Sequence, residues 1–472
     1  MTFDDSRPHG MAEKDRLSLI QKMREKLSNR TPANPAAPVS MPQGPDDSAC
    51  DFSQFADVKK IAIHKAVARQ WGIDSMYFLC HEGVARDTTV IGGKTCLNFS
   101  TYDYLGLNGS PALTAAATAA LEKYGSSASG SRPTSGERPP HRELERALAD
   151  LHGAKDCVVF VSGHATNVWT IYQLFKKRDL VLYDSLSHNS IIQGAQISGA
   201  VRLPFPHNDL DALEETLAAE RGNYRRALIV TEGLFSMDGD IPDLPRLVEL
   251  KKRYGCLLMV DEAHALGVLG PTGRGLAEHY GMDPGVVDIW MGTLSKTLCG
   301  CGGYVAGRAE LVECLKYLAP GFLYSVGMSP PLAAASREAV AVMLREPERV
   351  QKLQDISRYF LDYARQKGLD TGRAQGHAVI PIMVGGSVET AMLASRLFQQ
   401  GVYVIPIIFP VVEEKAARLR FFLSSLHSRE QVRHAIDLAA RELPLVRQTA
   451  AAMIEDTEAD PDRDEQDQPH RG

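Results

Sequence analysis

The stretch MGTLSKTLCGCGGYV, residues 291 to 305, places a single lysine in a turn of small residues between two strand-like runs. The run before the lysine, DIWMGTL, is mostly apolar, and the run after it, GGYVAG, is rich in glycine. A lysine that only faced solvent would need no such setting. Lys296 therefore invites a chemical explanation, and a lysine paired with a carboxylate is the alternative.

Short apolar runs alternate with helix-like segments from residue 155 to about 307. In chain order they are DCVVFVSG, DLVLYD, AVRLPF, RALIVTEG, CLLMVDEA, DIWMGTL and GGYVAG. Strands that are nearly all apolar and separated by helices predict a mostly parallel sheet covered on both faces. The predicted fold class is therefore α/β, with a seven-stranded, mostly parallel sheet in a large domain and a smaller α+β domain at the C-terminal end.

The chain of 472 residues exceeds what one hydrophobic core usually holds. After about residue 345 the pattern changes to helices and short strands such as HAVIPIMV. We expect a polar leader (1–50) with one amphipathic helix-like piece, an N-terminal arm packing on the small domain (51–120), a large domain (121–345), a small domain (346–447) and an acidic disordered tail (448–472).

Composition excludes several classes of function. The net charge of -6 and the lack of a long basic block argue against nucleic-acid binding. No apolar run reaches the roughly 18 residues that span a bilayer, and the N-terminus lacks the order of a secretion signal. The eight cysteines contain no CxxC pair and fit reduced thiols, so we expect a cytoplasmic location.

Polar residues follow the predicted strands at their carboxyl ends, where open parallel sheets bind ligands. They are Gly163 and His164, Asp184 and His188, the residues from Glu232 to Ser236, Asp261 and His264, and the residues from Thr293 to Lys296. Because several strand ends converge on polar groups, the sequence predicts a ligand site at this edge of the sheet.

Two of these residues suggest a particular ligand. Burying the carboxylate of Asp261 is costly unless a cation meets it, and a protonated pyridine nitrogen would be such a cation. Lys296 could form a Schiff base if burial lowers its pKa, because only the neutral amine is nucleophilic.

The remaining residues could complete such a site. His264 is close enough in sequence to Asp261 to reach the same ligand, and His188 could lay its ring across a flat cofactor. Gly163 and His164, at a strand-to-helix junction, could turn backbone N–H groups toward a phosphate. Each histidine could instead be structural, but the combination predicts a pyridoxal phosphate site.

Eight motifs in one order resemble the α-oxoamine synthase family of fold-type I pyridoxal-phosphate enzymes, over roughly residues 95 to 440. They are NFSTYDYLGL, GSRPTSGERPPHRELE, VSGHATN, DSLSHNS, TEGLFSMDGDIPDL, VDEAHALGVLGPTGRG, GTLSK and RLRFFLSSLH. Members join glycine, serine or alanine to an acyl thioester and release carbon dioxide. The resemblance implies an acyltransferase whose acyl group arrives on coenzyme A or on an acyl carrier protein.

The resemblance also implies catalytic roles. Lys296 would hold the cofactor and later move the α-proton of the substrate. Asp261 would bind the ring nitrogen, and His188 would stack on the ring. No metal ligand is implied.

Further residues would bind the cofactor and the substrate. Ser236 and His264 would lie near the phenolic oxygen, and Gly163, His164 and Thr293 would bind the phosphate. Ser325, in FLYSVGMSP, would reach the phosphate of a neighbouring subunit, which implies a homodimer. Arg420 would hold the amino acid carboxylate, for which its planar fork is suited, although a surface arginine is the alternative.

Two departures from the family pattern bear on the substrates. Synthases of the biotin and sphingolipid pathways carry an Arg-Pro-Pro-x-Thr stretch before the last strand, whereas this chain reads IIFPVVEEKAARLR, more like the glycine-using aminoketobutyrate ligase branch. His164 stands where relatives often place an aromatic residue. The amino acid and the acyl chain are left open.

Two other functions compete with this interpretation. The nearest is an aminotransferase or amino acid decarboxylase of the same fold. The other is a noncatalytic subunit of the kind that lacks the lysine, which the presence of Lys296 and Asp261 disfavours.

Overall fold

The structure is a computed structural model, and it describes residues 50–70 and 75–459. The chain divides into two compact units, residues 1–71 and 72–472. In the first unit the described residues form a short 3-10 helix, η2 (Phe52–Gln54), and helix α2 (Ala56–Gln70). The predicted leader, with its amphipathic piece, lies almost wholly outside the described residues.

The second unit contains a seven-stranded sheet with the order β4-β10-β9-β8-β7-β5-β6. The strands are β4 (Asp156–Phe160), β5 (Asp179–Asp184), β6 (Val201–Phe205), β7 (Arg226–Glu232), β8 (Leu257–Asp261), β9 (Ile289–Thr293) and β10 (Gly303–Gly307). Strand β10 is antiparallel to both of its neighbours, and the other four pairs are parallel. The prediction of a mostly parallel seven-stranded sheet is confirmed, and all seven apolar runs are its strands.

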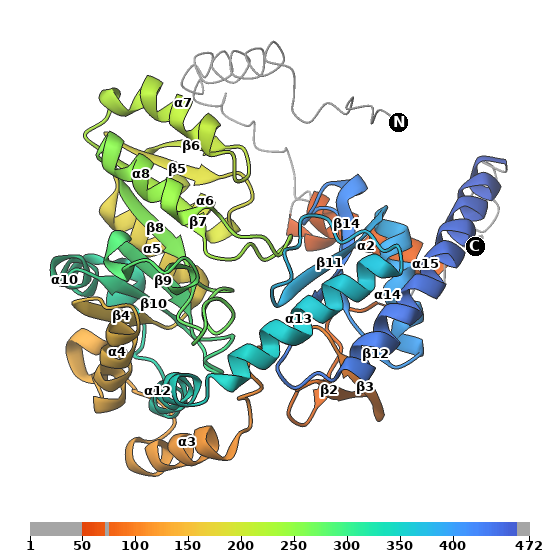
Figure 1. The fold of residues 1–472 in the computed structure, drawn as a ribbon, viewed down its shortest axis with the longest axis horizontal. Helices are drawn as coiled ribbons and strands as arrows, with labels where there is room; N and C mark the ends of the chain where they lie inside the picture. The colour runs from red at the N-terminus through yellow and green to blue at the C-terminus, as the bar shows by residue number, and fades with distance from the viewer. Residues whose placement is uncertain (1–49, 71–74, 460–472) are drawn as a thin grey trace, which may run out of the picture. The chain divides into compact units, whose positions relative to one another are not determined.

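Helices cover both faces of this sheet (Figure 1). One face packs on α5 (Gly163–Leu174), α6 (Asn189–Ser198), α10 (Ala309–Leu318) and α11 (Pro320–Leu323). The other packs on α4 (Pro139–Leu151), α7 (Leu210–Glu220) and α8 (Leu244–Tyr254), and α12 (Pro330–Arg345) packs on α4 and on α3 (Pro111–Tyr124). In β7, Leu228 and Val230 face the first set of helices and Ile229 faces the second. This alternation explains why the strands are apolar throughout.

Smaller sheets form the rest of the second unit. Strands β11 (Val379–Gly385), β14 (Ala417–Phe422) and β13 (Ile405–Ile407) make an antiparallel sheet. A second sheet joins β1 (His81–Glu82), β2 (Thr88–Ile91), β3 (Lys94–Asn98) and β12 (Val402–Tyr403). Because β3 pairs in parallel with β12, the N-terminal strands of this unit are built into its C-terminal part.

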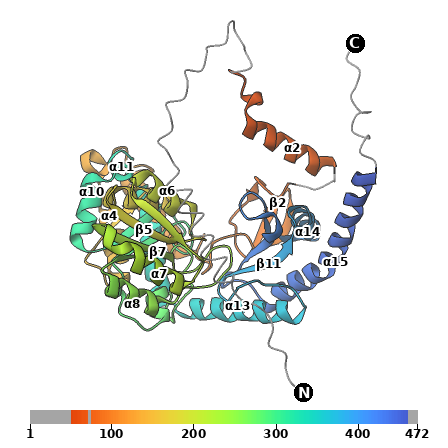
Figure 2. The ribbon, with the colours of Figure 1, turned by 90° about the horizontal axis from the view of Figure 1, so that it is seen from above.

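Three helices accompany these sheets: α13 (Glu348–Gln366), α14 (Ser387–Gln399) and α15 (Arg429–Ala459). Figure 2 shows α13 running from the part with the large sheet to the part with the small sheets. The expected tail begins at residue 448, within α15, and residues 460–472 lie outside the described part. None of the helices within residues 50–70 and 75–459 is long and apolar enough to cross a membrane.

Candidate active site

Lys296 and Asp261 lie at the same edge of the large sheet. Asp261 is the last residue of β8 and pairs with Met291 of the neighbouring β9, whose end leads to Lys296. On its other side Asp261 pairs with Glu232, the last residue of β7. The charges of Asp261 and Glu232 both act on the Lys296 amine. The amine and the acid predicted from the sequence are therefore brought together.

The turn around Lys296 is closed by backbone hydrogen bonds. Leu294 N donates to Gly302 O at 2.9 Å, and Gly300 N donates to Leu294 O at 2.7 Å. The Lys296 amine lies 5.8 Å from the ring centroid of Tyr102, and it forms no ion pair with any described residue. Burial lowers the Lys296 pKa to about 8, although Asp261 and Glu232 act in the opposite direction. The alternative of a lysine paired with a carboxylate is not what the structure shows.

The Asp261 carboxylate is buried and is held by two hydrogen bonds. Asn167 Nδ2 donates to Oδ2 at 2.8 Å, and Ala263 N donates to Oδ1 at 2.9 Å. No described cation forms an ion pair with it. Asn167 belongs to the motif VSGHATN, but nothing in that motif predicts its contact with Asp261. Only the packing of α5 on the sheet brings it to β8.

His188 and His164 lie near each other at the exposed mouth of the site. Their ring centroids are 6.1 Å apart at an interplanar angle of 77°. His188 caps α6, its backbone N donates to Glu232 Oε1 at 2.6 Å, and its Nδ1 lies 2.7 Å from Ser190 Oγ. His188 is an exposed residue of the site, although partial burial lowers the pKa of its ring.

His264 lies deeper in the site. Its Nδ1 is 2.6 Å from the Tyr104 hydroxyl, and its ring stacks on Phe422 with centroids 6.0 Å apart. Burial, assisted by the positive charges of Lys296 and Arg420, keeps the His264 pKa well below its usual value. The imidazole is therefore neutral and can exchange hydrogen bonds without adding charge.

The N-terminus of α5 forms a close contact with the lysine strand. A Cβ at Gly163 would lie 2.8 Å from Thr293 Oγ1, so only glycine fits there without displacing the threonine. Thr293 Oγ1 donates to Gly302 O at 3.0 Å, and Ser162 caps the helix by accepting from Ala165 N at 3.3 Å. The free N–H groups of a helix N-terminus are suited to a phosphate.

Arg418 and Arg420 alternate along β14, and their environments differ. Arg418 Nη1 donates to Asp238 Oδ1 at 2.8 Å, which neutralises it. Arg420 Nη1 donates to Ser236 O and Met237 Sδ, each at 3.3 Å, and its guanidinium lies 4.6 Å from the Phe422 ring centroid. Its Nε is buried without a partner, and it forms no ion pair with any described residue. Arg420 is thus not a surface arginine but a half-buried cation with no anion beside it among the described residues.

The two serines predicted for the site are placed differently. The Ser236 carbonyl oxygen accepts the hydrogen bond from Arg420 Nη1. Ser325 Oγ donates to Gly321 O at 2.7 Å, and no hydrogen bond between described residues links it to the other predicted site residues. Its proposed role depends on a second subunit.

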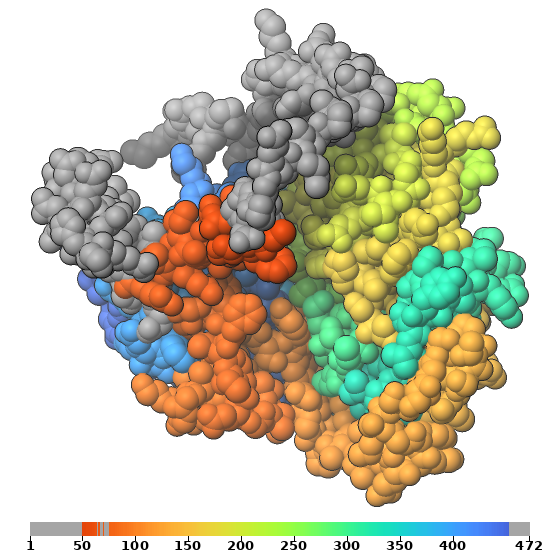
Figure 3. Space-filling view, turned by 180° about the vertical axis from the view of Figure 1, so that it is seen from behind, coloured from red at the N-terminus to blue at the C-terminus, as the bar shows by residue number. Residues whose placement is uncertain are grey.

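A cavity of about 410 Å³ opens beside Lys296. Its lining comprises His81, Ala85, Asn98, Ser100, Thr101, Tyr102, Asp103, Asn108, Ser295, Lys296, Cys299, Gly300, Tyr403 and Ile405. Figure 3 shows this unit hollowed between the orange N-terminal segment and the yellow and green large domain. Ser295, Cys299 and Gly300 belong to the lysine turn, whereas the remaining lining residues come from three segments, 81–85, 98–108 and 403–405, that only the fold brings to it.

The residues present fit pyridoxal phosphate. Among the described residues the buried Asp261 carboxylate has no cation, the Lys296 amine has no anion, and the N–H groups of Gly163 and His164 at the start of α5 have no acceptor. A cofactor with a pyridinium nitrogen, an aldehyde and a phosphate would satisfy all three. The fold and the site together define a fold-type I pyridoxal-phosphate enzyme.

Comparison with known proteins places the chain within this class. Residues 94–438 match the family model described as aminotransferase class I and II, and the chain belongs to that family. A Gloeobacter violaceus protein with a provisional 8-amino-7-oxononanoate synthase name is 44% identical over 357 residues, covering 75% of this chain and 89% of that protein. The 8-amino-7-oxononanoate synthase of Symbiobacterium thermophilum is 40% identical over 364 residues, covering 76% of this chain and 92% of that protein.

Solved structures agree with these relatives. A serine palmitoyltransferase structure with pyridoxal phosphate has a TM-score of 0.80 at 28% identity, covering 84% of this chain and 99% of that chain. The 8-amino-7-oxononanoate synthase of Francisella tularensis has a TM-score of 0.64 at 25% identity, covering 74% and 98%. The resemblance to the α-oxoamine synthases is confirmed, and the chain is a pyridoxal-phosphate-dependent acyltransferase of that family. The similarity of the IIFPVVEEKAARLR segment to the aminoketobutyrate ligase branch receives no support from these relatives.

Proposed function

We propose that this protein condenses a small amino acid, glycine, serine or alanine, with an acyl thioester on coenzyme A or an acyl carrier protein and releases carbon dioxide. The single observation that carries the amino acid half of this proposal is Arg420. It is a half-buried guanidinium with an unpaired Nε and without a carboxylate partner among the described residues. A planar fork of this kind binds a carboxylate through paired hydrogen bonds.

The cofactor, when bound, supplies an electron sink for a carbanion at the α-carbon of the amino acid. We assign its ring nitrogen to Asp261, which Asn167 and the Ala263 amide hold in place. We assign its phosphate to the N-terminus of α5 and to Thr293. His188 would cover its ring, and Ser236 and His264 would lie near its phenolic oxygen.

Lys296 has two tasks in this proposal. Its amine would hold the cofactor in the resting enzyme, and the same amine would take the proton from the α-carbon of the bound amino acid. A pKa of about 8 leaves a useful neutral fraction of the amine at neutral pH. Arg420 fixes the carboxylate, so that the α-proton is presented to the lysine in a constant position.

We also propose that the enzyme is a homodimer, because a surface segment, residues 317–326, presents apolar side chains. Tyr317, Leu318, Tyr324 and Val326 are 72%, 55%, 86% and 49% exposed. Their segment lies on the surface in Figure 3, where it is blue-green. An apolar surface of this kind marks an interaction site, and Ser325 lies within it.

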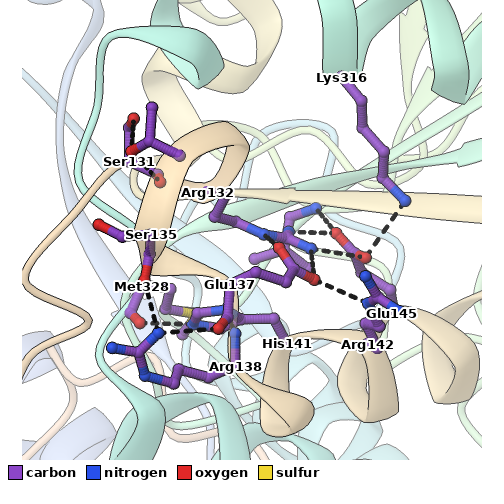
Figure 4. A network of polar contacts seen from close by, with 12 residues as sticks. Ser131, Arg132, Ser135, Glu137, Arg138, His141, Arg142, Glu145, Lys316 and Met328 are labelled. Carbon is purple, nitrogen blue, oxygen red and sulfur yellow. Dashed lines mark hydrogen bonds and ion pairs between the residues drawn. The ribbon is translucent and has the colours of Figure 1, made fainter.

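A polar network in the motif GSRPTSGERPPHRELE supports this segment (Figure 4). Arg132 is buried and bonds Glu137 and Glu145, and its guanidinium lies 5.2 Å from the Phe322 ring centroid. His141 Nε2 lies 2.6 Å from Met328 O, and Gly327 N donates to Gly130 O at 2.8 Å.

If the exposed apolar segment forms a dimer interface, light scattering should give twice the chain mass. Val326→Asp should lower the measured mass toward that of the monomer.

Two assays test the proposed reaction. Glycine, L-serine and L-alanine are first screened for a change in the cofactor absorbance. Release of carbon dioxide is then measured with and without acyl thioesters of several lengths. Release that requires the thioester supports the proposal, release with the amino acid alone supports a decarboxylase, and transfer of the amino group without release supports an aminotransferase.

A cytoplasmic location is also proposed, on the basis of eight cysteines that are all free.

A further inference from the structure

His207 lies between two buried carboxylates in the large domain. Its Nδ1 is 2.9 Å from Asp184 Oδ1, and its Nε2 is 2.8 Å from Asp240 Oδ2. Asp184 ends β5, His207 follows β6, and Asp240 lies in the loop after β7. None of these residues is assigned to the cofactor, although Asp184 is one of the polar residues predicted at the strand ends.

The geometry requires a charged imidazole. Because both ring nitrogens face carboxylate oxygens, both have to carry a proton in order to donate. Burial alone lowers the His207 pKa, but the hydrogen bonds and charges of Asp184 and Asp240 outweigh it and raise the pKa to about 9. The charge of Asp184 also helps to raise the pKa of Glu232, and the charge of Asp240 partly opposes the lowering of the His377 pKa by burial. Asp184, His207 and Asp240, called the charged triad below, therefore stay joined by charge-assisted hydrogen bonds at neutral pH.

Asp240, at one end of the charged triad, closes the loop of residues 235–240. Phe235 N donates to Asp240 O, and Gly239 N donates to Phe235 O, both at 2.9 Å. The Phe235 ring packs edge-on against His207, with centroids 4.5 Å apart. Asn208 Nδ2 adds a 3.0 Å hydrogen bond to Asp240. The shape of this loop thus depends on where His207 holds Asp240.

The opposite side of the loop contacts the small sheet that carries Arg420. Arg420 Nη1 donates to Ser236 O at 3.3 Å, and Arg418 Nη1 donates to Met237 O at 3.1 Å. Gly239 lies so close to β11 that a Cβ would be 2.0 Å from Val379 O. Four consecutive residues of the loop, 236–239, thus contact the small sheet or the segment before it.

We propose that His207 is a positioning residue for amino acid binding, because it holds loop 235–240 in the shape that orients Arg420. The inference rests on the proposed function, in which Arg420 binds the substrate carboxylate. His207 acts only through the loop and touches neither substrate nor cofactor. Its loss should let the Ser236 carbonyl shift, so that the guanidinium turns away from the carboxylate.

The test compares His207→Gln with His152→Gln in the cofactor-loaded enzyme. His152 is also buried and its Nε2 lies 2.8 Å from the Tyr304 hydroxyl, so its loss controls for lowered stability. Dissociation constants of glycine, L-serine and L-alanine are measured by absorbance. We expect His207→Gln to raise the constant at least tenfold and His152→Gln to change it less than twofold. In an Arg420→Lys background, His207→Gln should raise the dissociation constant little further, because the arginine that His207 positions is no longer present.

A second measurement does not depend on an amino acid. The rate at which phenylglyoxal modifies Arg420, followed by mass spectrometry of its peptide, should change severalfold in His207→Gln and not in His152→Gln. If the unchanged enzyme binds none of the three amino acids, the proposed function fails, and the Arg420 rate alone decides the inference. The inference is wrong if the two variants have equal amino acid affinities and equal rates of Arg420 modification. It is also wrong if His207→Gln has the same effect on amino acid affinity with and without Arg420.

Discussion

Asn167 donates a 2.8 Å hydrogen bond to Asp261 across 94 residues of sequence. Asp261 is the acid that we assign to the cofactor ring nitrogen, so the orientation of its carboxylate depends on helix α5. The same helix presents its N-terminus where we place the phosphate. Two ends of the cofactor would thus be positioned by one helix.

Asn167→Ala should weaken cofactor binding about tenfold or more, because a hydrogen bond to a charged group contributes about 1.5–3 kcal/mol. The measurement is a titration of the apoenzyme with pyridoxal phosphate. Thr170→Val is the matched control, since Thr170 is buried one turn along α5 and its hydroxyl has no hydrogen-bond partner in the described part of the chain. Equal affinities in the two variants would remove Asn167 from the site.

Lys296→Ala should abolish turnover, and Asp261→Asn should slow it by roughly ten- to a hundredfold, because one charge-assisted contact is lost. Steady-state rates of carbon dioxide release measure both effects. The assignment is wrong if Lys296→Ala retains covalently bound cofactor and full activity.

Covalent attachment of the cofactor to the apoenzyme should accelerate about tenfold per pH unit below pH 8 and level off above it. The reason is that only neutral Lys296 reacts, and burial lowers its pKa to about 8. The charge of Asp261 raises this pKa, so Asp261→Asn should move the midpoint to lower pH. Stopped-flow absorbance measures the rates, and a midpoint near the ordinary lysine value would contradict the prediction.

Arg420→Lys should raise KM for the amino acid by roughly tenfold or more, because a point charge cannot reproduce the paired hydrogen bonds of the fork. Affinity for pyridoxal phosphate should stay unchanged. A variant that lost cofactor and amino acid affinity together would instead indicate a structural role for Arg420.

His207 should make stability depend on pH in the alkaline range. Its pKa is raised from 6.5 to about 9, so its contribution is fully present below about pH 6.5 and is lost as pH rises through 9. At about 1.4 kcal/mol per pKa unit, the contribution is on the order of 3 kcal/mol. Urea unfolding between pH 6 and 10 measures it.

The matched variants separate this effect from general alkaline unfolding. His207→Gln should show a smaller fall in stability across this range than the unchanged protein. His152→Gln should keep the fall, because burial holds the His152 pKa near 3, far below the range. A fall of the same size in His207→Gln would assign the alkaline loss to other groups.

The strands and their polar ends could be predicted because both depend on local sequence. A strand buried on two faces has to be apolar, and a polar residue at its end lies at the edge where parallel sheets bind ligands. Lys296, Asp261 and His188 were found in this way. The roles of Ser325 and Arg420 came only from the resemblance, because a serine in FLYSVGMSP and an arginine in a strand carry no such local signal.

The sequence by itself determined the large sheet, the order of its strands along the chain and the identity of the lysine and the acid at its edge. Only the tertiary structure decided that Asn167 holds Asp261, that His207 joins Asp184 to Asp240, and that Arg418 is paired while Arg420 is not. Hydrophobic periodicity reports which residues are buried, a property of each segment alone. Hydrogen bonds between distant segments depend on how those segments pack, and no local pattern encodes that.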